Sequence, residues 1–564
     1  MIKKKKNVYD FFLKKNYDAI FISIICLIIL VHISRFNGIH IDEGIYLSKS
    51  LGFGKWLLKI LTSSNYEEFS DLASIKTMTE YFDDLGGNNM FKPGGLDPHP
   101  PLTKIITFFG YILSPDFLTG LQKLRLGNCL LITVMIYFLY RFAVVNLGRL
   151  TAFISIFIFM TFPQVLGYAP TGLTDPTAMS INFLCIICFF EFHNTNKFYY
   201  WLTPFLFGLM FLAKISVLIT LFTVLIIIIF QSRKIYFILK FAVSVIFGYV
   251  IFICLTPQFW NDPVLKPYNY FLQHIKHYHT EILVFNHLVP SQYSKYIFWY
   301  PFFIFLFTLP SAYLFLFIYW IKNIITRSFK FDKIKLFIAI NSFIPLLISC
   351  LPFPPKYGST RLFLSVFPFA ALLFGIITVK FISKFSFRIK IFLLTLLFIV
   401  QPVLLYIIHP HYLLYSNEIS KTIYENEKLG IKMQECFMEL NETVISYLNS
   451  LPENTKIIFE PYNYDFLNLM YDNKILNKGI IAVKNIKEAD YVVMLASFHV
   501  NLLDYAWKKI PAFKTFSSNN IDYVKIFKIS DYKFYNLEKP YDFPGKNPGK
   551  LFWILNWLIN IIFY

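Results

Sequence analysis

Charged residues are scarce in this sequence, and cysteines are few. Only 15% of its 564 residues are charged, whereas 56% are hydrophobic and 20% are aromatic. Soluble domains carry about a quarter charged residues, so this shortage excludes an ordinary soluble protein. The apolar residues collect in runs such as residues 17–36, which are long enough to cross a bilayer. The composition therefore predicts a polytopic membrane protein with aromatic residues at both membrane interfaces.

The cysteines predict neither a disulfide framework nor a metal site. Six of the seven lie inside or at the edge of apolar runs, and Cys436 is the exception. Cys185 and Cys188 have the C-x-x-C spacing of redox and metal-binding motifs. Inside an apolar run, however, small hydrophobic side chains are the better interpretation. No cofactor is assigned from these residues, and the use of a divalent cation stays open.

The net charge of +19 has a membrane explanation. In a soluble protein it would indicate nucleic-acid binding. Here Lys and Arg recur in short loops between apolar runs, which is the positive-inside pattern. We therefore expect no nucleic-acid partner. The pattern places the N-terminus, with the cluster Lys3 to Lys6, in the cytoplasm, and we expect a bacterial inner (plasma) membrane.

About eleven apolar runs have the length and composition of transmembrane helices. They are residues 17–36, 124–145, 150–167, 176–192, 198–212, 215–230, 236–256, 297–321, 334–351, 361–380 and 389–408. Residues 102–114 are also apolar but reach only about two-thirds of span length. A full crossing there would move every later basic loop to the outer side. We therefore expect an interfacial or half-inserted helix at this segment.

The polar segments then define two domains. Residues 1–408 form the transmembrane domain. Its outer loops are residues 37–123, 167–175, 257–296 and 352–360. Residues 409–550 contain three segments that alternate apolar and polar residues and a helical pattern before them, which predicts a small extracytoplasmic α/β domain. Residues 551–564 are apolar but short, and an interfacial position is one interpretation. The predicted fold is thus an all-α polytopic membrane protein with this C-terminal domain.

Three carboxylates lie on the predicted outer side. Asp42 and Glu43 follow the first span by about six residues, and Asp175 begins another span. Apolar walls raise the pKa of a carboxyl group and make it a usable general base. For the adjacent pair, a solvated loop or a helix cap is the alternative interpretation. We predict that the three carboxylates converge at one site.

Basic side chains fall on the same outer side. Lys214 interrupts an apolar run, where a charge needs a partner, a function or a route to the interface. Lys356 and Arg361 lie in a Pro/Gly-rich hairpin, and a guanidinium there could bind a phosphate through two hydrogen bonds. An ordinary anchor at the membrane edge is the alternative for Arg361. His99 and Lys104 close the first outer loop around two prolines.

The order of these residues resembles a known family. The chain carries Asp42-Glu43, His99-Pro-Pro-Leu-x-Lys104, Thr174-Asp175, Leu209-Met-Phe-Leu-Ala-Lys214, Pro257-Gln-Phe-Trp-Asn-Asp-Pro263, Thr360-Arg361 and His409-Pro-His-Tyr. Together they resemble the phospholipid-carrier-dependent glycosyltransferases, which include protein O-mannosyltransferases and lipid A aminoarabinose transferases. These enzymes belong to the membrane-embedded C-type glycosyltransferase superfamily. The similarity extends over roughly residues 17–530, and the order and sidedness of the motifs are more specific than any one motif.

The resemblance implies a fold, a reaction and a set of roles. A sugar on a polyprenyl phosphate in the outer leaflet is attacked by an acceptor hydroxyl, with inversion, and the lipid phosphate leaves. Asp42 matches the residue assigned as the base, while Glu43 and Asp175 would orient substrates or hold a divalent ion. Cations that would neutralise the phosphate are Arg361, Lys214, Lys356 and Lys104, and His99 would shape the first loop beside it. The acceptor could be a lipid, a glycan or a protein hydroxyl.

Other classes of protein fit the sequence less well. A transporter or lipid flippase favours charges deep within spans, broken helices or an internal repeat, and the sequence shows one intramembrane lysine and no repeat. A polymerase or ligase of surface polysaccharide shares the lipid-linked substrate, but the acidic pair and the His-Pro-Pro turn favour a transferase. A receptor or scaffold explains the C-terminal segment without explaining the carboxylates.

Overall fold

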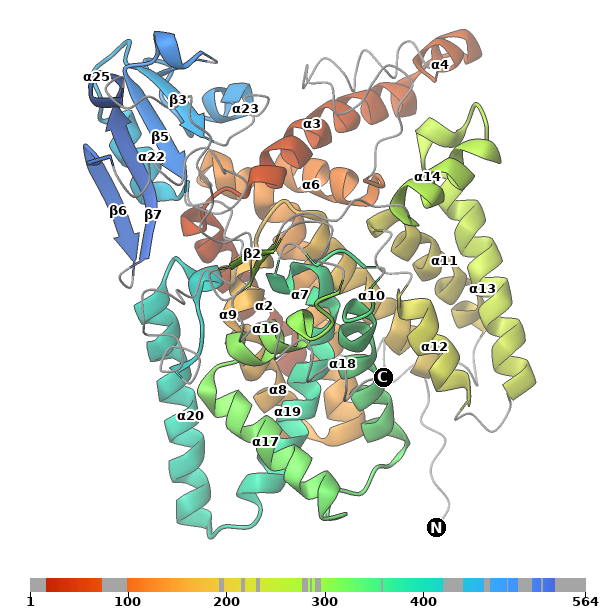
Figure 1. Ribbon diagram of the computed structural model, residues 1–564. Helices are drawn as coiled ribbons and strands as arrows, with labels where there is room; N and C mark the ends of the chain where they lie inside the picture. The colour runs from red at the N-terminus through yellow and green to blue at the C-terminus, as the bar shows by residue number, and fades with distance from the viewer. Residues whose placement is uncertain are drawn as a thin grey trace.

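The computed structural model describes residues 17–73, 99–191, 197–214, 219–229, 234–275, 282–284, 287–289, 296–352, 354–356, 359–418, 440–460, 467–483, 485–495, 510–518 and 521–532. Helices make up most of this part of the chain, and a small sheet lies at one end (Figure 1). The prediction of a mostly helical protein is therefore confirmed. Residues 551–564, for which an interfacial position was considered, lie outside the described residues.

The helices follow one another along the chain with short connections. Those of the first half are α2 (Tyr17–Phe36), α3 (Ile41–Thr62), α4 (Tyr66–Leu72), α6 (Leu102–Ile112), α7 (Gly120–Leu147), α8 (Arg149–Met160), α9 (Pro163–Tyr168), α10 (Thr174–Glu191), α11 (Lys197–Ala213), α12 (Ile219–Ile229) and α13 (Lys234–Cys254). Those that follow are η2 (Pro257–Phe259), α14 (Leu265–Ile275), α16 (Tyr300–Thr308), α17 (Ser311–Ile325), α18 (Lys333–Ser349), η3 (Ser359–Val366), α19 (Phe367–Ile382), α20 (Phe387–Ile408) and η4 (Tyr412–Leu414). A two-stranded hairpin, β1 (Ile282–Val284) and β2 (His287–Val289), lies between α14 and α16.

Within the described part of the chain, five helical segments are long and apolar enough to cross a membrane. They are Tyr17–Phe36, Gly120–Leu147, Ile235–Cys254, Thr360–Ile382 and Phe387–Ile408. Shorter apolar helices pack beside them, as α8 does against α19. Side chains of α20 are exposed along most of its length, which suits a helix surrounded by lipid. These helices make the chain an integral membrane protein.

Two predicted spans are each broken into two helices, which corrects their boundaries. The run at 150–167 divides into α8 and α9 at Pro163, and the run at 297–321 divides into α16 and α17 at Pro310. Proline lacks the backbone N–H that a helix interior needs, and it holds the preceding residue in an extended conformation. Leu309 accordingly has φ −72° and ψ 131°. Hydropathy alone did not register these breaks.

The segment at 102–114 forms a helix, α6, of 11 residues. At a rise of 1.5 Å per residue it is too short to cross a bilayer. It packs closely on α7 through Gly110 and Gly127, since a Cβ on Gly110 would lie 2.2 Å from the backbone nitrogen of Gly127. This close approach fixes the middle and the second half of α6 against α7; Lys104 lies in the first turn of α6 and His99 precedes it.

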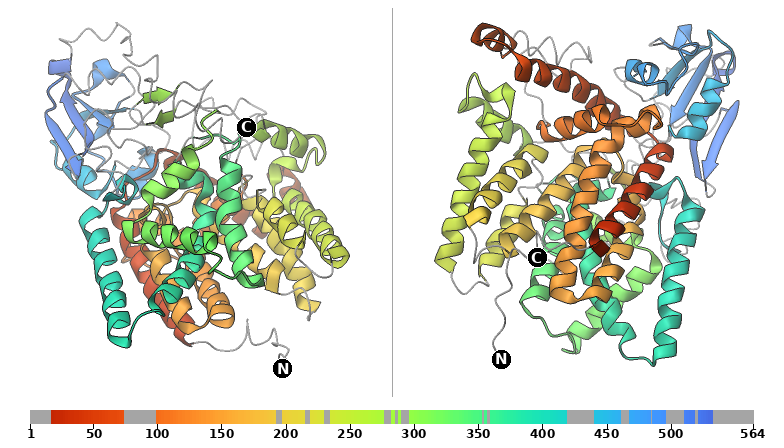
Figure 2. Two further views of the ribbon diagram at one scale, coloured as in Figure 1. Left: turned by 60° about the horizontal axis from the view of Figure 1, so that its bottom comes forward. Right: turned by 180° about the vertical axis from the view of Figure 1, so that it is seen from behind.

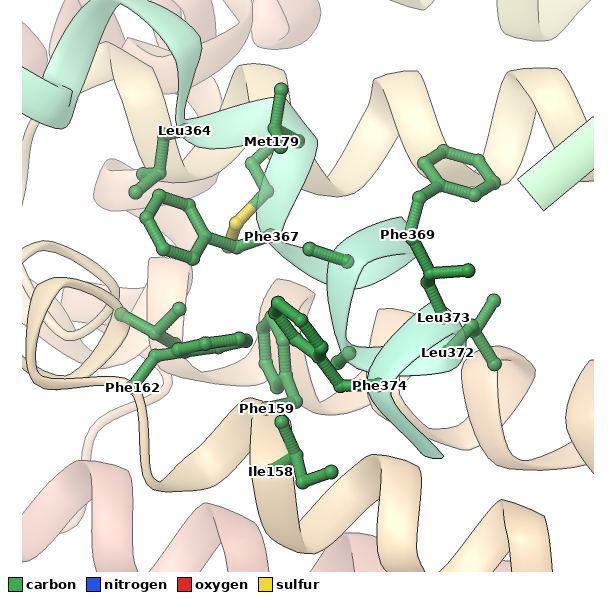
Figure 3. Close-up of a cluster of buried hydrophobic side chains, with 14 of the residues drawn as sticks. Ile158, Phe159, Phe162, Met179, Leu364, Phe367, Phe369, Leu372, Leu373 and Phe374 are labelled. Carbon is green, nitrogen blue, oxygen red and sulfur yellow. The ribbon is translucent and has the colours of Figure 1, made fainter. Parts of the chain in front are cut away.

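Aromatic rings fill the centre of the helical bundle. Phe162, just before α9, packs against Phe367 and Phe374 of α19, with ring centroids 5.1 and 6.2 Å away (Figure 3). Burial of large aromatic side chains supplies much of the packing energy of such a core. Because η3 leads directly into α19, this core holds the segment that carries Arg361.

The polar elements gather at one end of the bundle. In the views of Figures 1 and 2, α3, α6 and the sheet lie at the same end, whereas the turn between α19 and α20 lies at the opposite end. That opposite turn carries Lys384, Arg388 and Lys390. Elements of the predicted outer loops and the C-terminal sheet therefore lie at one end of the bundle, and the side of the membrane that this end faces stays a prediction.

The C-terminal sheet has five strands in the order β4-β3-β5-β7-β6. Its elements are α22 (Glu442–Asn449), β3 (Lys456–Glu460), α23 (Leu467–Asp472), β4 (Ile481–Ala482), η7 (Ile486–Glu488), β5 (Tyr491–Leu495), β6 (Lys514–Ser518), β7 (Ile521–Lys528) and α25 (Ile529–Tyr532). β3 is parallel to β4 and β5, and β7 is antiparallel to β5 and β6. A bridge between Ile39 and Leu440 joins this unit to the chain between α2 and α3.

Candidate active site

The acidic pair lies in the first turn of α3, directly after the turn that follows α2. His40 caps this helix: its Nδ1 accepts a hydrogen bond from the backbone N–H of Asp42, at 3.0 Å. The Glu43 carboxylate accepts a hydrogen bond from the backbone N–H of His40, at 3.2 Å. Such reciprocal bonds satisfy backbone groups that a helix start leaves unpaired. The alternative of a helix cap thus holds for part of the pair, and the cap fixes the direction of both carboxylates.

Glu43 is fully buried and bound to Arg125 of α7. Its two carboxylate oxygens accept from Nε and a terminal nitrogen of Arg125, at 2.7 and 2.6 Å, and one of them also accepts from the Gly172 backbone N–H. Arg125 donates its remaining hydrogen bonds to the carbonyl oxygens of Ser34, Asn37 and Gly38. A bidentate pair of this kind ties α2, α3, α7 and the loop before α10 together.

Asp42 points instead to Arg361, and Arg361 also binds Asp175. A terminal nitrogen of Arg361 lies 2.7 Å from Oδ2 of Asp42, and its Nε lies 2.8 Å from Oδ2 of Asp175. The ammonium of Lys214 lies 2.5 Å from the other oxygen of Asp175. Residues separated by more than three hundred positions therefore meet in one network. It contains two carboxylates and two cations, which balance in formal charge.

Exposure differs between the two carboxylates of this network. The Asp175 side chain is 3% exposed and that of Asp42 is 36% exposed. Burial acts to raise the pKa of Asp42, but the charge of Arg361 and the neighbouring His40 outweigh it and hold that pKa well below its usual range. Burial and Arg361 lower the pKa of His40 to about 4, although nearby carboxylates oppose this. Asp42 is therefore ionised and His40 is neutral near pH 7.

His99 and Lys104 lie beside this network through α3. The hydroxyl of Tyr46, one turn after Asp42, lies 2.9 Å from Nε2 of His99. The two rings also meet edge to face, with centroids 4.6 Å apart. Lys104 donates a hydrogen bond to the backbone oxygen of His99, at 3.0 Å. Tyr46 and Lys104 thus hold the His-Pro-Pro turn, and the charge of His99 lowers the pKa of Asp42.

Lys356 has a different set of partners. Its ammonium donates to the carbonyl oxygens of Ser349, at 2.6 Å, and of Leu351 at the end of α18. A cation at this position interacts favourably with the helix dipole and with the carbonyl groups that a helix end leaves unpaired. Burial lowers the pKa of Lys356 to about 8, opposed by Cys350. The structure does not bring Lys356 into the network of Arg361, so its predicted contact with a phosphate stays a prediction.

A narrow cavity opens beside the network. Its lining includes Asp175, Arg361, Met179, Thr220 and Pro345. Charged groups form one part of its wall, and apolar or weakly polar groups from α10, α12, α18 and η3 form the rest. The residues just before the two charged ones, Thr174 and Thr360, have buried hydroxyl oxygens without a hydrogen-bond partner among the residues that the structure describes. Buried polar atoms of this kind are uncommon. The surroundings of Asp175 and Arg361 are thus incompletely satisfied.

Two residues of this site were not assigned roles from the sequence. Arg125 lies second in the apolar run at 124–145, where an arginine is unexpected, and that position is the signal that could have identified it. Tyr46 gave no signal beyond its place one helical turn after Asp42. Among the described residues, no group of three or more His, Cys, Asp or Glu side chains is arranged to hold a metal ion. Cys185 and Cys188 are buried and unbonded to each other.

The site lies at one end of a membrane-embedded helical bundle and joins carboxylates to an arginine and a lysine. Part of the chain is also similar to a known protein family. Residues 98–260 match the family model described as Dolichyl-phosphate-mannose-protein mannosyltransferase. That segment contains His99, Lys104, Arg125, Asp175 and Lys214. The match confirms the resemblance of the chain to the polyprenyl-phosphate-dependent glycosyltransferases.

Solved structures were compared as well. The crystal structure of ArnT from Cupriavidus metallidurans bound to undecaprenyl phosphate superposes with a TM-score of 0.49 and 13% sequence identity, covering 90% of this chain and 97% of that one. The apo structure of the same protein gives a TM-score of 0.49 and 13% identity, covering 91% and 98%. No curated protein sequence matches this chain.

Proposed function

We propose that this protein transfers a sugar from a polyprenyl-phosphate carrier to an acceptor hydroxyl at the extracytoplasmic face of a bacterial inner membrane. The observation that carries the proposal is the position of Arg361, which binds Asp42 and Asp175 at once. One cation is thereby placed between a partly exposed carboxylate and a buried one, and Arg361 and Asp175 both line the cavity. The family match supports the same class of reaction.

Asp42 acts as the general base in this proposal. The acceptor oxygen forms a bond to the anomeric carbon, and the bond from that carbon to the phosphate oxygen breaks. The proton of the acceptor hydroxyl goes to Asp42, and the electron pair of the broken bond goes to the phosphate. The raised pKa expected from the sequence is not found, because Arg361 lowers the pKa of Asp42. Asp42 suits the role because it is ionised and its side chain is the more exposed of the two carboxylates. A single displacement of this kind inverts the anomeric centre.

The leaving phosphate gains negative charge, and Arg361 and Lys214 supply positive charge where it develops. Both cations are already held by Asp175, so little reorganisation is needed when the phosphate arrives. A guanidinium also binds a phosphate through parallel hydrogen bonds. Asp175 is in this account a positioning residue for the two cations. Glu43 fixes the start of α3 through Arg125, so its part in binding substrates or a divalent ion is not supported by its contacts.

The proposal is tested by transfer from radiolabelled polyprenyl-phosphate sugars with the purified full-length protein. Asp42→Asn keeps the size of the side chain and removes the base, so transfer should fall by about 10²–10⁴-fold. Asp116→Asn is the matched control, since Asp116 is fully exposed and its ion pair in the described part of the chain is with Lys123. Unchanged transfer by Asp42→Asn would remove Asp42 from the mechanism. A product with retained anomeric configuration would exclude the single displacement.

A further inference from the structure

A second cavity lies where the membrane helices meet the C-terminal unit. It has a volume of about 360 Å³, within the range of ligand pockets. The end of α2, the turn after α20 and the start of α22 enclose it. Its lining consists of Phe36, His409, Pro410, Glu442, Thr443 and Ser446. None of these residues belongs to the network around Arg361.

The polar groups of this cavity are unsatisfied by the protein. Arg35 directs both of its hydrogen bonds, at 2.9 and 2.6 Å, to one oxygen of Glu442, and the other oxygen has no hydrogen-bond partner in the described part of the chain. The hydroxyls of Thr443 and Ser446, one helical turn apart on α22, likewise have none among the residues described. His409 uses Nδ1 with the hydroxyl of Tyr412, and its Nε2 has no hydrogen-bond partner within the described ranges.

An aromatic surface faces these polar groups. Phe36 meets the ring of His409 edge to face, with centroids 5.2 Å apart, and belongs to the cavity lining. Flat apolar rings bury C–H groups of a ligand, while hydroxyl and carboxylate groups can donate to or accept from its polar edge. The lining thus combines two hydroxyls, a carboxylate oxygen and an imidazole with the Phe36 ring, over which the Arg35 guanidinium lies 5.5 Å from the ring centroid. This combination suits a ligand with a ring and several hydroxyl groups.

The charge of the cavity disfavours an anion. The Arg35 guanidinium and the Glu442 carboxylate neutralise one another. Burial and the facing His32 lower the pKa of His409, so this imidazole is neutral near pH 7. Nearby His411 packs on Tyr523, and burial lowers its pKa to about 4. No net positive charge is left to bind a phosphate or a carboxylate.

We infer that this cavity binds a neutral pyranose ring, as a subsite for a sugar residue of a glycosylated acceptor. That the sugar belongs to an acceptor rests on the proposed function. The binding of a sugar ring is argued from the cavity alone. Phe36 is six residues from Asp42, so the two sites are at most roughly 20 Å apart along the chain. The bridge from Ile39 to Leu440 holds this connection against the start of α22.

Direct binding tests the inference without requiring turnover. The full-length protein is placed in lipid nanodiscs after purification in a detergent that carries no sugar. Methyl hexopyranosides of the gluco, galacto and manno series are titrated, and binding is followed by saturation-transfer NMR on the ligand. At least one should bind saturably, whereas glycerol phosphate should not. The absence of saturable binding by all three sugars, or equal binding of glycerol phosphate, would overturn the inference.

Variants locate the binding in this cavity. The double variant Thr443→Val with Ser446→Ala removes two hydroxyls and should weaken binding about tenfold through the loss of their hydrogen bonds to the sugar. Phe36→Leu should weaken it through loss of the aromatic surface. Ser450→Ala is the matched control, because Ser450 is an exposed serine on the end of the same helix and its hydroxyl binds the Tyr447 backbone oxygen. Unchanged affinity in the double variant and in Phe36→Leu would contradict the assignment.

The bound sugar could belong to a glycolipid or to a soluble saccharide. A second titration, with octyl hexopyranosides that partition into the bilayer, distinguishes these two sources. Tighter binding of the octyl form indicates a glycolipid, and equal binding indicates a soluble saccharide. Failure of this inference is distinguishable from failure of the proposed function. Transfer that depends on Asp42 without saccharide binding rejects the subsite alone. Saccharide binding that depends on Thr443 and Ser446, with transfer unaffected by Asp42→Asn, rejects the proposed mechanism alone.

Discussion

The pair formed by Arg125 and Glu43 allows a quantitative prediction. A guanidinium has five N–H groups, and in this structure all five are used. Two bind Glu43 and three bind the backbone oxygens of Ser34, Asn37 and Gly38. Lysine keeps the positive charge but offers only three donors. Arg125→Lys therefore leaves at least two buried acceptors without their hydrogen bond.

The expected loss follows from this count. A hydrogen bond that involves a charged group contributes about 1.5–3 kcal/mol, and buried acceptors left unpaired cost a similar amount. Two lost bonds give roughly 3–6 kcal/mol of unfolding free energy, a range that includes the cost of about 3–5 kcal/mol for breaking a buried ion pair. The turn between α2 and α3 should also loosen. Because this turn positions Asp42, transfer should fall further than the loss of folded protein explains.

Unfolding free energies are measured by denaturant titration of the purified protein in lipid. Arg35→Lys is the matched control, since the pair of Arg35 with Glu442 is exposed and such pairs contribute about 1 kcal/mol or less. A third variant, Arg125→Met with Glu43→Leu, replaces the buried pair by apolar groups and should regain much of the stability lost in Arg125→Lys. Equal stability of Arg125→Lys and Arg35→Lys would refute the reasoning, because it would mean that the five bonds contribute nothing beyond charge.

Two further predictions concern Arg361 and Lys356. Arg361 lowers the pKa of Asp42, so Arg361→Gln should raise that pKa. The acid limb of the pH profile of kcat/KM for transfer should then move to higher pH. If this limb does not move, another group titrates there. The lowered pKa of Asp42 stabilises the folded protein above the pKa of the unfolded carboxyl, about 3.9, and this stability is lost as pH falls through the folded value. Lys356→Met should reduce the unfolding free energy by about 1–3 kcal/mol, because two backbone carbonyl oxygens lose their hydrogen bonds. The KM for the carrier should stay unchanged within about twofold. A large rise in that KM would instead place Lys356 at the phosphate.

Hydropathy and charge predicted most of the helices but not how they are divided. The run at 17–36 is a helix with the same bounds, because an uninterrupted apolar segment has no local signal that competes with a helix. The breaks at Pro163 and Pro310 were missed because a window average gives one proline little weight. The strands β3, β5 and β7 fall within the segments that alternate apolar and polar residues. Their order in the sheet depends on contacts between distant segments, which periodicity does not describe.

The sequence predicted which residues meet at the site better than it predicted which of them pair with one another. Sidedness brought Asp42, Asp175, Lys214 and Arg361 to one end of the bundle, and they meet there. Which cation faces which carboxylate depends on how η3 packs against α10, and no local pattern states it. Lys356 shows the limit of the argument, since a lysine on the same side and near the same hairpin binds the end of α18.

The adjacent carboxylates illustrate why one motif can contain two different functions. Successive residues of an α-helix point about 100° apart, since a turn takes 3.6 residues. At the first turn of α3, that rotation sends Glu43 inward to Arg125 and Gly172, and leaves Asp42 facing Arg361 at the rim. Exchanging the two residues, Asp42→Glu with Glu43→Asp, keeps the composition and the charge but shortens the inner side chain by one methylene. It should break the five-bond arrangement at Arg125, so stability and transfer should both fall. Full activity of the exchanged variant would show that only the total charge of the pair matters, and not the direction in which each carboxylate points.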